Sequence, residues 1–257
     1  MEKRFDALRA FSLFSLALLL LPVILLLFYG FVVYRSPQSF TRVVFSSIML
    51  TLSSSFTACV IVSALFTPFA YELARRRRPL EEALSEIPAS IPHPVVGIAL
   101  LILDSPLTPT GKALQSIGIN FFDSYLGLVI ALVTVSAPIY IRSLHSFFES
   151  LPKEPELFAM SLGAPRLKVL FDVVLPNSYR GVLLSFLISM SRAMSEFGSI
   201  AILAYYVLQP PFNGVSPASV LIYDFYGYYG PTVAVTTAAL LVVVSLPFAF
   251  AARLIKR

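Results

Sequence analysis

The sequence predicts an all-α, polytopic membrane protein with six transmembrane helices, and two features of the composition predict this class. The chain has 257 residues, of which 57% are hydrophobic and only 13% are charged, about half the charged share of a soluble domain. Asp, Glu, Lys and Arg are absent from residues 10–34, 43–71, 87–103, 124–141 and 225–252. A helix needs about 20 apolar residues to cross the hydrocarbon core of a bilayer, and these gaps are of that order.

The apolar runs are expected to form the spans in chain order within a single transmembrane domain. The first run is longer than the apolar region of a signal peptide, roughly 7–15 residues, and no small-x-small cleavage site follows it. We therefore expect a retained span with the N-terminus in the cytoplasm. The expected spans are residues 10–34, 44–74, 94–103, 124–141, a span from 178 onward, and 231–252, with a core at 44–252. The turn-rich segments 104–122 and 205–229 are expected to be external loops.

The start of the third span is rich in proline. Proline lacks a backbone N–H and disfavours helix at the residue before it, so residues 88–94 are expected to be irregular, with a clean helix at 94–103. A helix N-terminus at membrane depth presents free N–H groups that suit an anion. Two interpretations stay open for Pro92, His93 and Gly97: a gate or anion-facing helix start, or an ordinary cytoplasmic turn that enters a span.

Positive charges predict the orientation of the chain. Most of its 19 Lys and Arg residues flank span ends that the six-span order places on one side of the membrane, and residues 75–78 are four consecutive arginines. Segments rich in Lys and Arg stay in the cytoplasm, so both termini and the loop at 148–177 are predicted to be cytoplasmic in a cell (plasma) membrane. This placement explains the net charge of +5. The expected contact of these charges is membrane lipid, and no nucleic-acid partner is expected.

Two ionisable residues lie inside the fifth span. Arg192 and Glu196 are four residues apart, on one face of a helix, and a helix that begins at residue 178 carries Arg192 about 21 Å inward. Ionisable groups at that depth face a bundle interior or a cavity. Two roles stay open for this pair and the neighbouring Ser195: a structural ion pair between helices, or a position along the substrate path.

The loop at 148–177 is the one long polar segment between strongly apolar runs. It is predicted to contain a short amphipathic helix that exposes Leu157, Phe158 and Leu162 and that ends at Gly163. A helix of this kind outside the bilayer inserts its apolar side into a groove on a partner. A helix that lies in the membrane interface is the alternative.

The same loop resembles the cytoplasmic loop of ABC-importer permeases, in which Glu-Ala-Ala is followed by three residues, Gly, nine residues and Ile-x-Leu-Pro. The residues on register are Ala159, Gly163, Val173, Leu175 and Pro176. Glu156 lies one place early, and Leu157 and Phe158 stand where Glu-Ala is usual. The resemblance implies coupling to an ATPase, with motion passed on to the fifth span. The coupling residues implied are Glu156, Leu157, Phe158, Ala159, Leu162, Gly163, Val173, Leu175 and Pro176.

Three further stretches look like those of molybdate/tungstate ABC-importer permeases: residues 91–100, residues 192–198 and residues 204–206. This resemblance implies a type I permease fold and alternating access. It implies a second copy of the chain, two ABC ATPase subunits that bind ATP and Mg, and an extracytoplasmic substrate-binding protein. The chain itself is then not an enzyme and holds no cofactor and no metal. The gate or path residues that follow are Pro92, His93, Gly97, Arg192, Ser195 and Glu196.

Other functions stay open as alternatives. A permease for sulfate or another small solute is the nearest of them. A secondary transporter usually shows paired intramembrane carboxylates or repeated broken spans, and no clear internal repeat is found. An enzyme is disfavoured because the sequence shows no metal-binding cluster, no Ser/His/Asp grouping and only two histidines. Gly111-Lys112 also lacks the first glycine and the Ser/Thr of a phosphate-binding loop.

Overall fold

The computed structural model describes residues 7–255. Lys3, Arg4, Lys256 and Arg257, expected at the cytoplasmic ends, lie outside the described residues. Within this range every named element is a helix, and the extended backbone pairs at an isolated bridge between residues 207 and 215. The predicted all-α class is confirmed.

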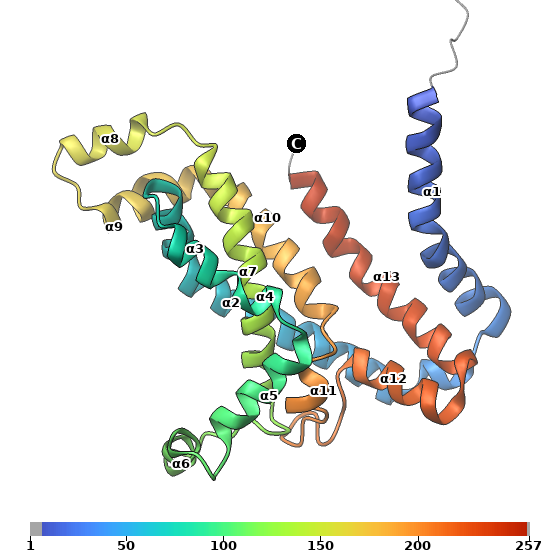
Figure 1. Cartoon of the computed structure of the whole chain (residues 1–257). Coiled ribbons are helices and arrows are strands. Elements are labelled where there is room, and N and C mark those ends of the chain that lie inside the picture. The colour runs from blue at the N-terminus through green and yellow to red at the C-terminus, as the bar shows by residue number, and fades with distance from the viewer. Residues whose placement is uncertain (1–6, 256–257) are drawn as a thin grey trace, which may run out of the picture.

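The helices are named here in chain order, as labelled in Figure 1. They are α1 (Ala7–Phe28), η1 (Tyr29–Tyr34), η2 (Pro37–Phe40), α2 (Arg42–Arg75), α3 (Pro79–Ser85), α4 (Ile87–Ser90), α5 (His93–Asp104), α6 (Pro109–Ser116), α7 (Tyr125–Glu149), α8 (Glu154–Ser161), α9 (Arg166–Val169), η3 (Leu170–Val174), α10 (Leu175–Met194), α11 (Ile200–Leu203), α12 (Ala218–Tyr229) and α13 (Pro231–Ile255). The π-helix η1 continues α1. The π-helix η3 joins α9 to α10.

Among the described residues, five stretches are long and apolar enough to cross a membrane. They are Ala7–Tyr34, Arg42–Arg75, Tyr125–Glu149, Arg166–Met194 and Pro231–Phe248. A sixth span exists only if α5 and α6, bent by 67° at a short break, count as one. At 12 residues, α5 is about 18 Å long, which is too short to cross the hydrocarbon alone. The chain is a multi-pass membrane protein.

The centre of the bundle is the packing of α2, α7 and α10 (Figure 1). Leu50, Leu132 and Met190, one from each helix, are buried in the same apolar cluster. Across the contact between α2 and α7, the hydroxyl oxygens of Thr67 and Tyr140 lie 2.7 Å apart. Hydroxyls and small side chains let membrane helices approach closely and bond to each other, which explains why α2 is rich in both.

The first helix, α1, stands apart from this bundle (Figure 1), and none of its residues is buried. The chain attaches it through the segment that follows. Thr236 of α13 donates a hydrogen bond to the Gly30 carbonyl at 3.2 Å, and Ser39 donates to the Val233 carbonyl at 3.0 Å. Most of the apolar surface of α1 is therefore left uncovered by the described part of the chain.

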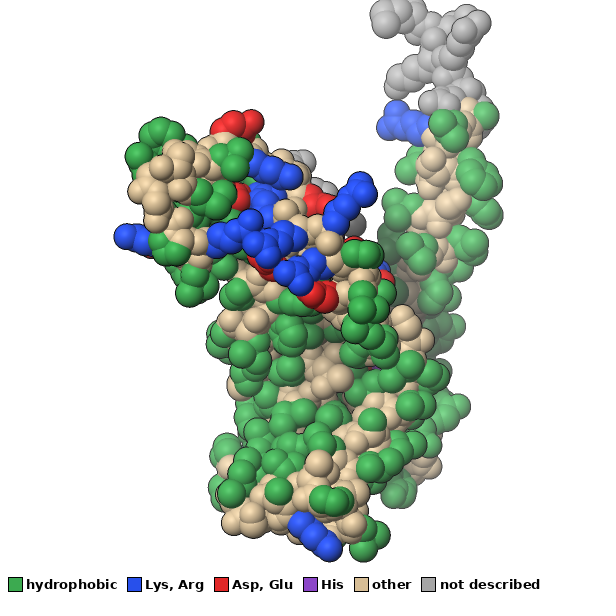
Figure 2. Space-filling model, turned by 60° about the vertical axis from the view of Figure 1, so that its left-hand side comes forward, with side chains coloured by type: hydrophobic (Ala, Val, Ile, Leu, Met, Phe, Trp, Pro, Cys, Tyr) green, Lys and Arg blue, Asp and Glu red, His purple; other side chains and the backbone are tan. Residues whose placement is uncertain are grey.

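Lys and Arg side chains gather over one end of the molecule, next to a largely apolar surface (Figure 2). Arg76, Arg78, Arg142 and Arg166 are exposed or half-exposed there. We call this the basic end. The start of α1 and the end of α13 point toward it, as do α3 and α8 (Figure 1). The clustering agrees with the prediction that most Lys and Arg residues lie at one side of the membrane. That this side is the cytoplasmic one stays a prediction.

The predicted irregular stretch at residues 88–94 is mostly wrong. Residues 88–90 belong to α4, and α5 already begins at His93. Prolines are tolerated in the first turn of a helix, where no N–H is needed, and both helices have proline there. Only Ile91, which precedes a proline, and Pro92 have extended backbone, as expected for the residue before proline.

Both predicted external loops contain a helix, so they too need correction. Residues 109–116 form α6, and residues 218–229 form α12. In the second loop the turn residues lie before Pro217, the N-cap of α12, and its buried Val220 and Leu221 pack inward. The fifth span also begins earlier than residue 178, because helix runs through η3 without a break and Pro176 lies in the first turn of α10.

The contact between α2 and α7 can be tested at Tyr140, which is fully buried. We expect Tyr140→Phe to lower the free energy of unfolding by about 1 kcal/mol, because it removes the hydrogen bond between Thr67 and Tyr140 that joins the two helices. Thermal unfolding in detergent, followed by circular dichroism, measures this. Tyr179→Phe is the matched control, since Tyr179 is 60% exposed; equal melting temperatures for both variants and the native chain would contradict the assignment.

Candidate functional site

The helix α8 is defined at both ends by local sequence. Glu154 and Glu156 lie in its first turn, where negative charge complements the helix dipole. At the other end Gly163 has a φ of +84°, and its N–H bonds to the carbonyl of Met160 while Ala164 bonds to that of Ala159. This is the glycine-terminated helix end that a left-handed residue allows. The prediction that Gly163 ends the helix is confirmed.

The outer side of α8 is apolar. Leu157, Phe158 and Leu162 are 60%, 68% and 74% exposed, on a helix that projects from the basic end (Figure 1). Leu167 and Phe171, on the helix that follows, are also exposed and were not singled out from the sequence. The exposed apolar side chains of Leu157, Phe158 and Leu162 lie outside the candidate spans, and such a patch indicates a surface that another molecule covers.

Glu156 lies on the opposite side of α8 and is only 5% exposed. Arg75 of α2 binds it, with Nη2 2.6 Å from Oε1 and Nε 3.0 Å from Oε2. Tyr71 donates to Oε2 at 2.7 Å, and the remaining Nη1 of Arg75 donates to the Phe148 carbonyl of α7 at 2.6 Å. Burial would raise the pKa of the Glu156 carboxyl, but hydrogen bonds from Arg75 and Tyr71 outweigh it and hold that pKa below its ordinary value.

The other predicted loop residues lie between α8 and the bundle. Ala159, Val173 and Leu175 are partly buried against the apolar cluster that contains Phe148, whereas Pro176 is exposed. Ala159, Val173 and Leu175 therefore pack α8 and its connection to α10 against the bundle. Sequence reasoning treated Arg75 only as an orientation marker and missed Tyr71. The available signal was their spacing of four residues, which puts a phenol and a guanidinium on one face of α2.

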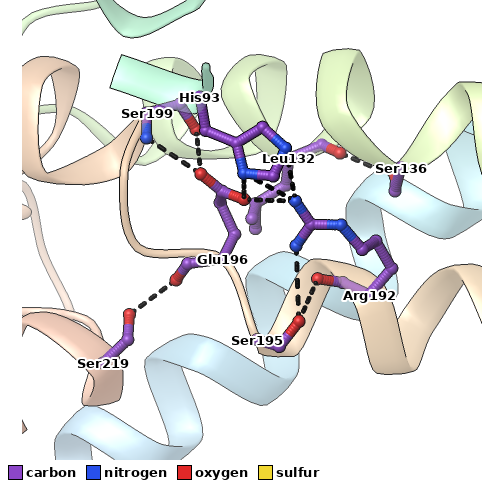
Figure 3. A network of polar contacts seen from close by, with 8 residues as sticks. All are labelled: His93, Leu132, Ser136, Arg192, Ser195, Glu196, Ser199 and Ser219. Carbon is purple, nitrogen blue, oxygen red and sulfur yellow. Dashed lines mark hydrogen bonds and ion pairs between the residues drawn. The ribbon is translucent and has the colours of Figure 1, made fainter. Parts of the chain in front are cut away.

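The second predicted group surrounds two helix breaks that meet inside the bundle (Figure 3). One break separates α4 from α5 and the other separates α10 from α11. His93, Arg192 and Glu196 point toward one another from these segments (Figure 3). The Nη2 atom of Arg192 lies 2.9 Å from Oε2 of Glu196 and 2.7 Å from Nδ1 of His93. His93 Nδ1 lies 3.0 Å from the same carboxylate oxygen.

The Glu196 carboxylate holds the second break together. It is 1% exposed, and its Oε1 accepts hydrogen bonds from the backbone N–H and the hydroxyl of Ser199, each at 2.9 Å. Ser219 of α12 donates to the Glu196 main-chain carbonyl at 2.6 Å. We call Arg192, His93, Glu196, Ser199 and Ser219 the helix-break cluster. Ser199 and Ser219 were not predicted.

The remaining predicted gate residues lie around this cluster. Gly97 lets α5 approach the second break closely, since a Cβ there would lie 2.5 Å from the Ser199 carbonyl oxygen. Ser195 is exposed and accepts from Nη1 of Arg192 at 3.3 Å, and Pro92 is exposed at the first break. The expected pairing of Arg192 with Glu196 is present. It does not depend on one continuous helix, because α10 ends at Met194.

A family model matches the part of the chain that contains α8 and the helix-break cluster. It matches residues 69–257 and describes the binding-protein-dependent transport system inner membrane component. The chain belongs to this family. Among the described residues, no group of three or more His, Cys, Asp or Glu side chains is placed to hold a metal ion.

Individual members of the family carry more specific names. The molybdate/tungstate transport system permease protein WtpB of Pyrococcus furiosus is 34% identical over 200 residues, which cover 76% of this chain and 72% of the relative. The sulfate transport system permease protein CysT of Synechocystis sp. is 28% identical over 209 residues, which cover 80% of this chain and 72% of the relative.

A solved structure shows the same fold. It is a bacterial ABC transporter involved in the import of the acidic polysaccharide alginate, and it matches with a TM-score of 0.65 at 18% identity over 97% of this chain and 96% of that chain. The predicted type I ABC importer permease fold is confirmed.

The helix-break cluster can be tested at its carboxylate. Glu196→Gln keeps the shape but removes the charge that binds Arg192 and Ser199, so we expect the free energy of unfolding to fall by about 1–3 kcal/mol. Chemical unfolding of the purified chain in detergent measures this. Glu82→Gln is the control, because the Glu82 side chain is 51% exposed. A fully stable Glu196→Gln protein would mean that the cluster does not hold the breaks together.

Proposed function

We propose that this chain is the membrane permease subunit of an ATP-driven importer of a tetrahedral oxyanion, molybdate or tungstate. The observation that carries the proposal is α8, a short helix held outside the spans with Leu157, Phe158 and Leu162 exposed. Membership of the binding-protein-dependent family supports import. The 34% identity to a permease named for molybdate and tungstate supports the substrate.

The proposed orientation puts the basic end in the cytoplasm. Arginines 76–78 and the exposed Arg142 and Arg166 lie there, and positive charge beside a membrane helix favours the cytoplasmic side. Both termini then lie in the cytoplasm, and α8 is accessible to a soluble ATPase. The α5–α6 bend then faces outward, where an extracytoplasmic binding protein delivers the substrate.

The proposed assembly contains two copies of this chain, two ABC ATPase subunits and one substrate-binding protein. ATP and Mg bind to the ATPase subunits, and this chain holds no cofactor. The uncovered apolar surface of α1 supports contact with lipid or with a second copy. Each α8 lies in a groove of one ATPase subunit, in the manner of an amphipathic helix in a partner's groove.

In the proposed cycle, closure of the ATPase subunits on ATP draws the two α8 helices together and opens the path outward. The helix-break cluster lies where broken helices meet, and such breaks are tolerated at membrane depth when they face protein or a cavity. The Glu196 carboxylate binds Arg192 at 2.9 Å and offsets its positive charge. A dianion is then not held tightly there and is released.

Docking of α8 is tested by Phe158→Asp, which puts a charge into the apolar surface. We expect the ATPase to bind at least about tenfold more weakly, because one central aromatic side chain often dominates an interface. Uptake into vesicles is then lost while the chain still inserts. Leu80→Asp is the control, since Leu80 is 71% exposed on α3 at the same end. Normal uptake by the Phe158→Asp complex would refute docking at α8.

Sulfate is the second candidate substrate, because a sulfate permease is 28% identical over 209 residues. Vesicles that carry the complete complex with its binding protein are given labelled molybdate, tungstate or sulfate, each with ATP inside. We expect uptake of molybdate or tungstate and little uptake of sulfate. Sulfate uptake that exceeds both would replace the proposed substrate and leave the permease assignment intact.

A further inference from the structure

The ion pair between Arg75 and Glu156 differs from the other ion pairs at the basic end. Its two side chains are 7% and 6% exposed, whereas those of Arg142 and Glu86 are 65% and 38% exposed. Exposed pairs contribute little, because water screens them and their side chains are mobile. A buried pair fixes the groups it joins, since removing one partner leaves the other charge unpaired.

This pair joins α8 to the bundle at a point where the chain itself is not helical. Residues 150–153 connect α7 to α8, and residues 162–165 connect α8 to α9. Arg75 bridges the first gap, because it binds Glu156 of α8 and the Phe148 carbonyl of α7 together. The guanidinium thereby fastens α2, α7 and α8 to one another through directional hydrogen bonds.

The far part of α2 leads to the helix-break cluster. Thr51, about 36 Å from Arg75 along the same helix, accepts a hydrogen bond from the Ala218 backbone N–H at 2.8 Å. Ala218 begins α12. The next residue, Ser219, donates to the Glu196 carbonyl at 2.6 Å. A continuous set of contacts therefore runs from α8 through α2 to the second helix break.

We propose that Arg75 and Glu156 are positioning residues that make α2 move with α8, so that α2 carries the partner's motion to the helix-break cluster. The proposal rests on the proposed function, in which α8 docks on the ATPase. It adds a route that does not pass through Val173, Leu175 and Pro176 into α10. Motion would reach the cluster from two sides, through α10 at Arg192 and through α2 at Ser219.

The test uses the complete complex in vesicles and measures molybdate molecules taken up per ATP hydrolysed. For Glu156→Gln we expect this ratio to fall by on the order of tenfold, because the unpaired buried Arg75 no longer fixes α8, while the ATPase stays bound and active. Glu86→Gln makes the same change in an exposed pair and should leave the ratio unchanged. An unchanged ratio in Glu156→Gln overturns the proposal.

Two further variants separate positioning from simple stability. Arg75→Met with Glu156→Met removes both charges, a change that often preserves stability; we expect a stable complex whose ratio stays low. A normal ratio in this double variant would mean that the pair only stabilises the fold. Thr51→Val removes the acceptor at the other end of α2 and should lower the ratio with α8 untouched, and a normal ratio there overturns the α2 route.

The two proposals fail in different ways. If α8 does not dock on the ATPase, Phe158→Asp leaves binding and uptake normal, and the function itself is wrong. If α8 docks but α2 carries no motion, Phe158→Asp abolishes uptake while Glu156→Gln and Thr51→Val keep the native ratio of uptake to ATP hydrolysis.

Discussion

Hydrocarbon offers no hydrogen bonds, so the polar groups freed by a break in a spanning helix must be satisfied within the protein. In this chain the break between α10 and α11 is satisfied mainly by the side chains around it, and the break before α5 packs against it. The Glu196 carboxylate binds Arg192 and the N–H and hydroxyl of Ser199, and its main-chain carbonyl accepts from Ser219. The contact requires the close approach that Gly97 permits. The irregular backbone at this break is thus satisfied by neighbouring side chains and by Ser219 of α12.

The spans and the end of α8 were predictable from local pattern, whereas contacts between segments distant in sequence were not. Runs without charge identify the spans because charges are costly in hydrocarbon, and Gly163 identifies the end of α8 because its φ is positive. The pairing of Arg75 with Glu156 spans 81 residues, and no local pattern specifies it. The helix α12 was missed because turn residues before it resemble a loop. Arg192 and Glu196 do form an ion pair, although α10 ends at Met194, before it reaches Glu196.

A shift of one residue explains why α8 has two distinct sides. In the loop pattern of the family the glutamate would stand at Leu157, and here it stands at Glu156. Successive residues on a helix are rotated by about 100°, so the shift turns the carboxylate inward to Arg75 and leaves leucine on the outer surface. Glu156 therefore serves the bundle rather than the docking surface. The apolar residues beside it, Leu157 and Phe158, are the ones left to contact a partner.

The charge balance of the helix-break cluster bears on where selectivity arises. A strong site for a dianion needs unopposed donors or cations in a region of low dielectric. Arg192 is instead bound to Glu196 at 2.9 Å, so its attraction for an anion is largely cancelled. Relatives named for molybdate/tungstate and for sulfate align with most of this chain. This similarity fits a membrane path that binds each of these anions weakly. On the proposed function, selectivity for the anion then comes from the binding protein, and the membrane chain controls when the path opens to each side.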